Sequence, residues 1–236
     1  MFQMNGTIRY SEVDKECRLT WSSLLNYFQD CSVAHSESLS LGVDYLEEHH
    51  MAWLLTSWQV VVTEMPTLGE EIKVQTWPYD FKGLYGYRNF LLRGKEDQVF
   101  AYANSVWALM DTERKRPRKV TEDIVKAYGL EAPYPMEICP RKLAEGDCFE
   151  KMEPIRVQKY FIDTNGHMNN EKYVMLAEEF VPGYFQIGEI RVEYKKSAMY
   201  EDLIIPRVTV DEKEVTVGLY GLDDKPYAIV KFIKRG

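Results

Sequence analysis

The chain has 236 residues, of which 45% are hydrophobic and 28% are charged, and its formal net charge is −8. This length and composition are typical of a globular protein with one large domain or two small ones. The negative charge argues against nucleic acid as the main partner. No apolar run approaches the roughly 18 residues that a membrane-spanning helix needs.

The cysteines and the amino-terminal residues indicate the cellular compartment in which the protein is expected. The four cysteines, Cys17, Cys31, Cys139 and Cys148, form neither a CxxC pair nor a regular framework, which indicates reduced thiols. The opening Met-Phe-Gln-Met-Asn-Gly lacks the basic and then apolar pattern of a secretory signal. We therefore expect a soluble, cytoplasmic protein.

The first 110 residues predict a helix followed by an antiparallel sheet. A short strand is expected at 4–10. From Leu19 onward, apolar residues recur at steps of three and four, which predicts an amphipathic helix of about four turns capped by Thr20 or Ser22. A second, short helix is expected at 43–48. Runs rich in β-branched and aromatic residues, separated by turn residues, then predict strands at 52–64, 71–79, 84–92 and 99–110.

The segment 111–150 differs from what precedes it. Basic residues and four prolines interrupt any period around a short helical pattern at 121–128. We interpret this segment as a crossing between two units. The predicted organisation is a first domain at 1–118, a linker with a short helix at 119–150, and a second domain at 151–236.

After the linker the same order of elements returns. A strand is predicted at 153–161 and a helix at 170–180. Further strands are predicted at 189–195, 203–211, 214–220 and 227–233. Strand, helix and then strands, twice over, indicates an internal repeat in an α+β protein. The alignment places Asp14 opposite Asp163.

The densest group of reactive side chains is the stretch Asp-Thr-Asn-Gly-His-Met-Asn-Asn at 163–170. Gly166 permits a tight turn, and Asn169 or Asn170 is suited to cap the following helix. The polar groups are thus expected at a helix start, where backbone N–H groups favour developing negative charge. The aligned positions of the first half carry other residues, namely Glu16, Arg18, Thr20 and Trp21. Chemistry is therefore expected in the second half.

Three residues of this stretch are the candidate catalytic residues. A histidine such as His167 can act as a general base toward water or hold it by a hydrogen bond. Asn165 offers an amide donor for a carbonyl oxygen. Asp163 can orient the histidine, or act itself as base or nucleophile. The alternative is that Asp163 and Asn165 only shape the loop through an Asx turn.

Other chemistries lack a sequence signature. The four histidines show no HExxH pattern and no paired Cys/His spacing. The chain also has no GxSxG, Walker or GxGxxG motif. We expect neither a metal ion nor a cofactor.

The pattern Asp-x-Asn-x-His-x-Asn-Asn-x-Lys-Tyr, from Asp163 to Tyr173, resembles the signature of the acyl-ACP thioesterases of plants and bacteria. Segments 26–30, 66–70 and 105–110 also resemble first-domain segments of that family. The resemblance implies two tandem hotdog domains, each a long helix packed in a curved antiparallel sheet. It implies hydrolysis of fatty acyl-ACP to free fatty acid and holo-ACP, which ends chain elongation. Asn165 and His167 would be catalytic, Asp163 would complete the site, and the first domain would hold the acyl chain.

One departure from the family pattern narrows the expected site. Plant members carry a Glu-Cys pair after a Glu-Tyr-basic-basic segment, whereas here Ser197 and Ala198 follow Lys195-Lys196. This favours Asp163, Asn165 and His167 acting mainly on a water molecule. Because the carrier is acidic in this family, the basic run at 114–119 and the pair Lys195-Lys196 are candidate docking points.

Several alternatives stay open from the sequence. A hotdog acyl-CoA thioesterase would differ in its carrier, a non-catalytic acyl-binding hotdog protein would release no thiol, and a hotdog dehydratase would leave the thioester intact. The protein is expected to be a monomer with internal hotdog pairing or a homodimer. The sequence leaves the preferred acyl chain undetermined, because that preference depends on tunnel depth.

Overall fold

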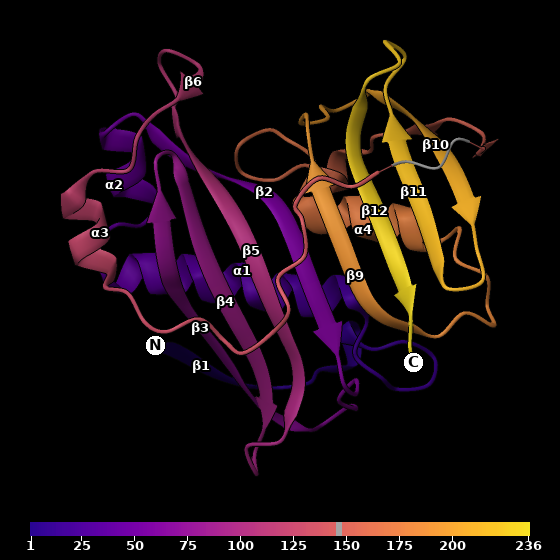
Figure 1. Ribbon diagram of the computed structural model, residues 1–236, viewed down its shortest axis with the longest axis horizontal. Helices are drawn as coiled ribbons and strands as arrows, with labels where there is room; N and C mark the ends of the chain where they lie inside the picture. Colours follow the sequence, from indigo (N-terminus) through magenta and orange to yellow (C-terminus); the bar gives the residue numbers. More distant parts are fainter. Residues whose placement is uncertain (145–147) are drawn as a thin grey trace. The chain divides into compact units, whose positions relative to one another are not determined.

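The computed structural model describes residues 1–144 and 148–236, and the chain divides into two compact units (Figure 1). The first unit comprises Met1–Thr56 and Val60–Ile138, and the second comprises Ser57–Gln59 and Cys139–Gly236. The predicted linker at 119–150 is thus divided between the units after Ile138, and its residues 145–147 lie outside the described residues.

The first unit is an antiparallel sheet with a long helix, α1 (Trp21–Ser38), across one face (Figure 1). The strands lie side by side in the order β1 (Phe2–Thr7), β3 (Glu71–Lys82), β4 (Tyr85–Gly94), β5 (Val99–Asp111) and β2 (Met51–Val62). A short strand, β6 (Arg116–Pro117), pairs with the end of β5. The four longer predicted strands and the predicted helix are confirmed, with α1 extending to 18 residues, whereas the strand predicted at 4–10 lies at Phe2–Thr7.

The helix α1 forms where the apolar spacing predicts it. Thr20 is its N-cap, and its side chain accepts a hydrogen bond from the backbone N–H of Ser23 at 3.2 Å. Leu24 and Phe28 recur at helical spacing and are fully buried. The ring of Phe28 packs on that of Phe90 in β4, with 5.1 Å between centroids. Apolar contact of this kind holds α1 on the sheet.

Two short helices share a smaller core in the first unit. They are α2 (Val43–Glu48), as predicted, and α3 (Glu122–Tyr128), which lies in the predicted linker. The buried residues of this core are Leu41, Met51, Leu109, Ile124 and Tyr128. Because Ile124 and Tyr128 are buried in it, α3 packs as part of the first unit.

The second unit repeats the plan with a shorter helix, α4 (Asn170–Glu178), on its sheet (Figure 1). The strands follow the order β9 (Ile187–Tyr194), β12 (Pro226–Lys234), β11 (Glu214–Tyr220), β10 (Leu203–Val210) and β7 (Glu150–Lys151). A further short strand, β8 (Ile155–Arg156), pairs with β10. The α+β prediction is confirmed.

The predicted strand at 153–161 is wrong over most of its length. Residues 155–156 alone belong to a strand there, and Lys159–Phe161 forms a 3-10 turn. The N–H of Phe161 bonds to the carbonyl of Gln158 at 3.0 Å, so that part of the chain bonds locally instead of in a ladder. Phe161 is nevertheless buried, which explains why its apolar pattern looked like that of a strand.

Two further observations concern the chain as a whole. Within residues 1–144 and 148–236, no helix combines the length and apolar character needed to cross a membrane. All four cysteines are described, and none of them is disulfide-bonded.

Candidate functional site

The predicted site residues lie on a closed loop that leads into α4. Ile162 and Met168 pair across the loop as an isolated β-bridge. The N–H of Asp163 donates to the carbonyl of His167 at 2.7 Å, and the N–H of Gly166 donates to the carbonyl of Asp163 at 3.1 Å. Gly166 has a φ of +76°, the left-handed conformation that glycine adopts without steric cost.

Asp163 holds this loop closed through one carboxylate oxygen. Its Oδ1 accepts the backbone N–H of Asn165 at 2.8 Å and that of His167 at 3.1 Å. This is the Asx-turn arrangement, in which a short acidic side chain bonds to its own downstream backbone. Asp163 therefore positions the backbone that carries His167. Among the described residues, no hydrogen bond joins its carboxylate to the imidazole ring.

The first unit contains the same loop, built around Asp14. Its Oδ1 accepts the N–H of Glu16 at 2.9 Å and that of Arg18 at 3.0 Å, and its own N–H donates to the carbonyl of Arg18 at 2.8 Å. Cys17 takes the left-handed position of the turn with a φ of 60°. The structure thus confirms the predicted alignment of Asp14 with Asp163.

The two loops have the same pattern of backbone hydrogen bonds and differ in their side chains. Where the first has Glu16 and Arg18, the second has Asn165 and His167 at the equivalent positions. Asn165 is exposed and His167 is half-buried. The ring of His167 has neither a hydrogen bond nor an ion pair with any residue that the structure describes. An imidazole held by its backbone but free at its ring can accept a proton from water.

Tyr173 on α4 is a supporting residue that was not among the three candidate residues. Its hydroxyl accepts the backbone N–H of Ala198 at 2.8 Å, and the carbonyl of Ala198 accepts the N–H of Met168 at 2.9 Å. Burial raises the pKa of Tyr173 well above its usual value, so the hydroxyl stays protonated. In the sequence, the feature that pointed to this role was the position of Tyr173 at the end of the motif that begins at Asp163.

The position of Ala198 clarifies the departure from the family pattern. These bonds place Ala198 beside the loop, and its side chain is fully buried. The Ser-Ala pair therefore lies next to the candidate residues, but Ala198 brings no carboxylate or thiol to them. Ser197 is exposed.

The start of α4 is braced from its sheet. The hydroxyl of Tyr194 in β9 donates to the backbone carbonyl of Asn170 at 2.9 Å, and its ring packs edge-on against that of Tyr173. Burial raises the pKa of Tyr194 as well. Asn169, one of the two predicted candidates, occupies the N-cap position, although its side chain makes no capping hydrogen bond.

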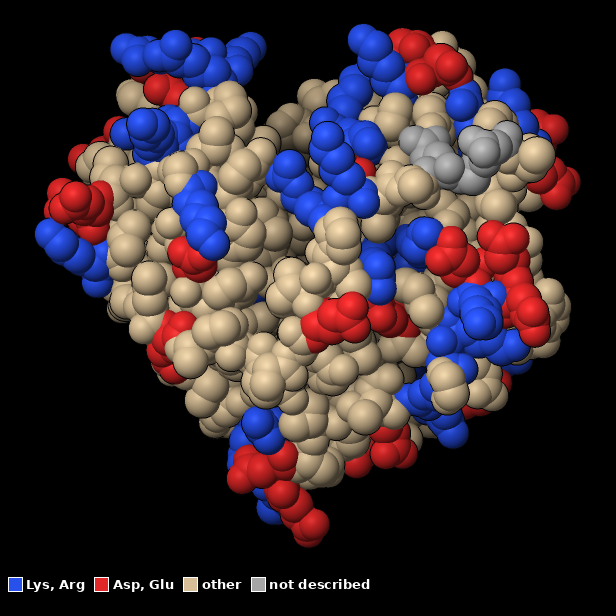
Figure 2. Space-filling model, in the orientation of Figure 1, with Lys and Arg blue, Asp and Glu red and all other residues tan. Residues whose placement is uncertain are grey.

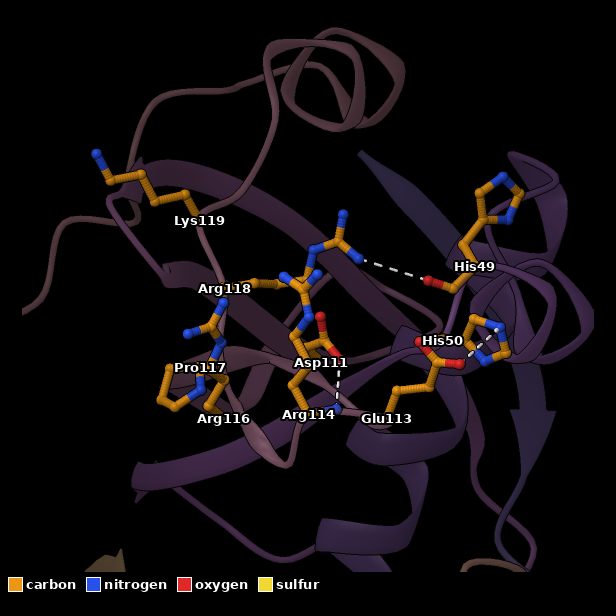
Figure 3. Close-up of a pocket in the computed structure, with 9 residues that line it drawn as sticks. All are labelled: His49, His50, Asp111, Glu113, Arg114, Arg116, Pro117, Arg118 and Lys119. Carbon is orange, nitrogen blue, oxygen red and sulfur yellow. Dashed lines mark hydrogen bonds and ion pairs between the residues drawn. The ribbon is translucent and has the colours of Figure 1, made fainter.

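A second polar feature lies in the first unit, at the turn between β5 and β6. Lysine and arginine side chains gather at the tip of this hairpin (Figure 2). They line a pocket of about 490 Å³ (Figure 3). Its lining residues are His49, His50, Asp111, Glu113, Arg114, Arg116, Pro117, Arg118 and Lys119.

Part of this pocket is internally bonded, and part is open to a ligand. Nη1 of Arg118 donates to the carbonyl of His49 at 3.4 Å. A hydrogen bond from the N–H of Arg114 lowers the pKa of Asp111, with smaller effects from the nearby arginines. The side chains of Arg114, Arg116 and Lys119 form no ion pair with any residue in the described part of the chain. Four lysine and arginine side chains thus line the pocket against two carboxylates, Asp111 and Glu113, which leaves an excess of positive charge there on an acidic protein.

Comparison with known proteins identifies the family. Residues 1–128 match the acyl-ACP thioesterase N-terminal domain, and residues 146–219 match the acyl-ACP thioesterase C-terminal domain. The chain belongs to the acyl-ACP thioesterase family.

Two plant proteins illustrate the similarity in sequence. A chloroplastic palmitoyl-acyl carrier protein thioesterase of Gossypium hirsutum is 24% identical over 243 residues, which cover 92% of this chain and 58% of that protein. A chloroplastic acyl-[acyl-carrier-protein] hydrolase of Cuphea viscosissima is 26% identical over 242 residues, which cover 93% and 57%. The chain spans a little over half the length of these relatives.

Solved structures of acyl-ACP thioesterases share the fold. An acyl-ACP thioesterase from Bacteroides thetaiotaomicron superposes with a TM-score of 0.90 at 24% identity, over 99% of this chain and 97% of that one. The 12:0-ACP thioesterase from Umbellularia californica gives 0.87 at 19% identity, over 99% and 96%. The expected pair of hotdog domains is confirmed.

Proposed function

We propose that this protein hydrolyses the thioester between a fatty acyl chain and acyl carrier protein, releasing free fatty acid and holo-carrier and so ending chain elongation. Family membership supports the reaction class. The observation that carries the proposal is the pair of matching loops. The second unit has Asn165 and His167 at the loop positions where the first unit has Glu16 and Arg18. The plant relatives are named for the same substrates.

We assign a role to each of the three candidate residues, and that of Asp163 is to position the backbone that carries the other two. Asn165 donates its amide N–H to the thioester carbonyl oxygen, assisted by the N-terminal end of α4. His167 is the general base, because its ring is unbonded within the described chain whereas Oδ1 of Asp163 is engaged by two N–H groups. The water oxygen attacks the carbonyl carbon, the carbon–sulfur bond breaks, and the proton taken up by His167 passes to the leaving thiolate.

We place the acyl chain in the core of the first unit and the carrier at the basic pocket of that unit. Of the two candidate docking points, the pocket is the one whose cations Arg114, Arg116 and Lys119 form no ion pair within the described chain. Lys195 and Lys196 are already paired, with Glu193 at 3.3 Å and Asp223 at 3.1 Å. An acidic carrier is attracted by charge that is not already neutralised, so the pocket is the better candidate. We also place the reaction in the cytoplasm, in keeping with the unbridged cysteines.

The proposal is tested by measuring thiol release from acyl-ACP substrates of graded chain length and from the matched acyl-CoA substrates. We expect release from acyl-ACP, with kcat/KM higher than for acyl-CoA of the same chain. A higher value for acyl-CoA would support the alternative acyl-CoA thioesterase. Purified protein that binds acyl-ACP but releases no thiol from either carrier would contradict hydrolysis.

A further inference from the structure

Arg88 is a buried cation without a carboxylate partner in the described chain. It lies on β4 and is 7% exposed. Its Nη1 donates to Nδ1 of His35 at 2.9 Å and to Oγ1 of Thr76 at 3.2 Å. Its guanidinium carbon lies 5.5 Å from the ring centroid of Tyr128. Removing a charge from water is costly unless an opposite charge accompanies it, so the isolated guanidinium calls for an explanation.

The electrostatic surroundings of Arg88 supply no carboxylate either. Burial lowers the pKa of Arg88, and the side chains that act in the opposite direction are Tyr128 and Cys31. Burial raises the pKa of the Cys31 thiol to about 12, so this thiol stays neutral. An arginine keeps its proton even when it is buried, because its ordinary pKa is above about 12. The first unit therefore holds a positive charge beneath its surface.

The bonds of Arg88 leave one edge of its guanidinium free. Nε and Nη2 form neither a hydrogen bond nor an ion pair with any described residue. The side-chain polar atoms of the described chain that are both unbonded and sealed from solvent are Oδ1 of Asn169 and Nε of Arg207. Because Nε and Nη2 of Arg88 are not among them, both retain solvent-accessible surface. The N–H groups along such an edge are parallel and match the two oxygens of a carboxylate.

The side chains around Arg88 are mainly apolar and aromatic. Arg88 and Phe90 are two residues apart on β4, so their side chains project from the same face of the sheet. That face is covered by α1, because Arg88 bonds to His35 and the ring of Phe90 packs on that of Phe28. The ring of His35 also stacks on that of Phe2, with 5.3 Å between centroids. These surroundings favour a ligand with an aliphatic chain.

We propose that the free edge of Arg88 binds the carboxylate of an aliphatic acid in the first unit. Nε and Nη2 each donate a hydrogen bond to one carboxylate oxygen, while Nη1 keeps its bonds to His35 and Thr76. The carboxylate neutralises the buried charge, and its chain packs between α1 and the sheet. Two kinds of molecule carry this group, namely a free fatty acid and an acyl chain that ends in a second carboxylate. The binding itself does not depend on the hydrolysis proposed above.

Equilibrium binding of dodecanoate and of dodecan-1-ol tests the site, because the two probes share a chain and differ in the carboxylate. Titration calorimetry on the full chain, below the concentrations at which the probes aggregate, should give a Kd at least about tenfold lower for dodecanoate. Arg88→Met should bring the two Kd values within about twofold of each other. Arg88→Lys keeps a charge without the fork, so its preference for dodecanoate should be intermediate.

Arg93→Met is the matched control on the same strand. Nε of Arg93 already donates to Oε1 of Gln75 at 3.2 Å, and Nη1 donates to the carbonyl of Asp97 at 2.8 Å. Its preference for dodecanoate should equal that of the wild type. A melting temperature for each variant shows that it is folded, and Arg88→Met should hold that of the wild type because it removes an isolated buried charge.

Thiol-release assays then distinguish the two sources of the carboxylate, and these assays rest on the proposed function. If the ligand is a free fatty acid, dodecanoate inhibits thiol release from acyl-ACP, and Arg88→Met weakens that inhibition by at least about tenfold. If the ligand is an acyl chain with a second carboxylate, an ω-carboxyacyl-ACP has a kcat/KM at least about tenfold above that of the unsubstituted chain. Arg88→Met removes this preference.

Two binding results would overturn the assignment. Equal Kd values for dodecanoate and dodecan-1-ol in the wild-type protein would show that no carboxylate site exists, and this comparison needs no variant to fold. A preference for dodecanoate that persists in folded Arg88→Met would show that another group binds the carboxylate. A protein that binds dodecanoate as expected but releases no thiol would contradict the proposed hydrolysis and leave the carboxylate site standing.

Discussion

His167 and Arg18 occupy one position in two copies of the same loop, and the backbone N–H of each donates to an aspartate Oδ1. The shared bond shows that the aspartate serves the shape of the loop in both units. What distinguishes the second unit is the side chain carried at that position, together with Asn165. At the scale of single residues, the proposed chemistry thus depends on the side chains that the second loop carries, because the two loops have the same backbone bonds.

Replacing His167 with alanine should remove the general base and leave the loop intact, because the Asp163 bond goes to backbone. We expect kcat for acyl-ACP to fall by about 10² to 10⁴ with little change in melting temperature. Arg18→Ala is the matched control, and its kcat should stay near that of wild type. A steady-state thiol-release assay measures both, and equal losses in the two variants would argue against His167 as the base.

His35, on α1, makes the stability of the first unit depend on pH. Nη1 of Arg88 donates to Nδ1 of His35 at 2.9 Å, and His35 is 7% exposed. Burial, then the charges of Arg88 and the amino terminus, lower the pKa of His35 to about 4. The imidazole is therefore neutral in the folded protein at a pH where the unfolded chain takes up a proton.

Stability should hold above about pH 6.5 and decline as pH falls toward 4, because the unfolded state then binds more protons. The loss attributable to His35 is on the order of 3 kcal/mol at most. Urea unfolding at pH 7 and pH 4.5 measures it. A His35→Gln variant should show a smaller difference between the two pH values, and an equal difference would refute the assignment.

At the scale of elements, the loop depends on a residue in the left-handed conformation. Gly166 and Cys17 both occupy it, and a Cβ at Gly166 would meet no atom within 4 Å. The cost of a side chain there is therefore conformational and not steric. The glycine lowers the energy of a turn that the cysteine of the first unit adopts under strain.

Gly166→Ala should lower the free energy of unfolding by about 1 kcal/mol, the cost of an alanine in this conformation. The control is Cys17→Ala, which exchanges one non-glycine residue for another at an equivalent turn and should change little. Thermal or urea unfolding of both variants measures the effect. A neutral Gly166→Ala would mean that the turn takes another conformation in solution.

At the scale of the whole molecule, an acidic chain gathers four lysine and arginine side chains around one pocket. The net charge of −8 gives no hint of this local excess. Charge that is not neutralised within the protein accelerates and orients the approach of an acidic partner. The pocket therefore supplies a local positive charge of the kind that the proposed acidic carrier would recognise.

Charge reversal in the pocket should weaken carrier recognition and leave chemistry alone. Arg114→Glu combined with Arg116→Glu should raise KM for acyl-ACP by about tenfold, with kcat and the hydrolysis of short acyl-thiol substrates unchanged. Lys195→Glu with Lys196→Glu is the control, and its smaller effect follows from ion pairs that already occupy those lysines. A larger effect in the control pair would move the docking point to the second unit.

The sequence by itself determined the elements and the candidate residues. Apolar spacing in α1 and alternation in the long strands are local properties, and the motif from Asp163 to Tyr173 is contiguous. All three can therefore be recognised from the sequence alone. The segment 153–161 was misread because a buried Phe161 in a turn gives the same pattern as a strand residue.

Only the tertiary structure decided how those residues act. It assigned the Asp163 carboxylate to two backbone N–H groups, placed Ala198 against the loop through Tyr173, and left Oδ1 of Asn169 without a hydrogen-bond partner among the described residues. Hydrogen-bond partners depend on which groups the fold brings within about 3 Å, and that distance is set by packing between segments far apart in sequence. Local pattern specifies which chemical groups are available, and packing decides which of them are bonded and which are left to meet a substrate.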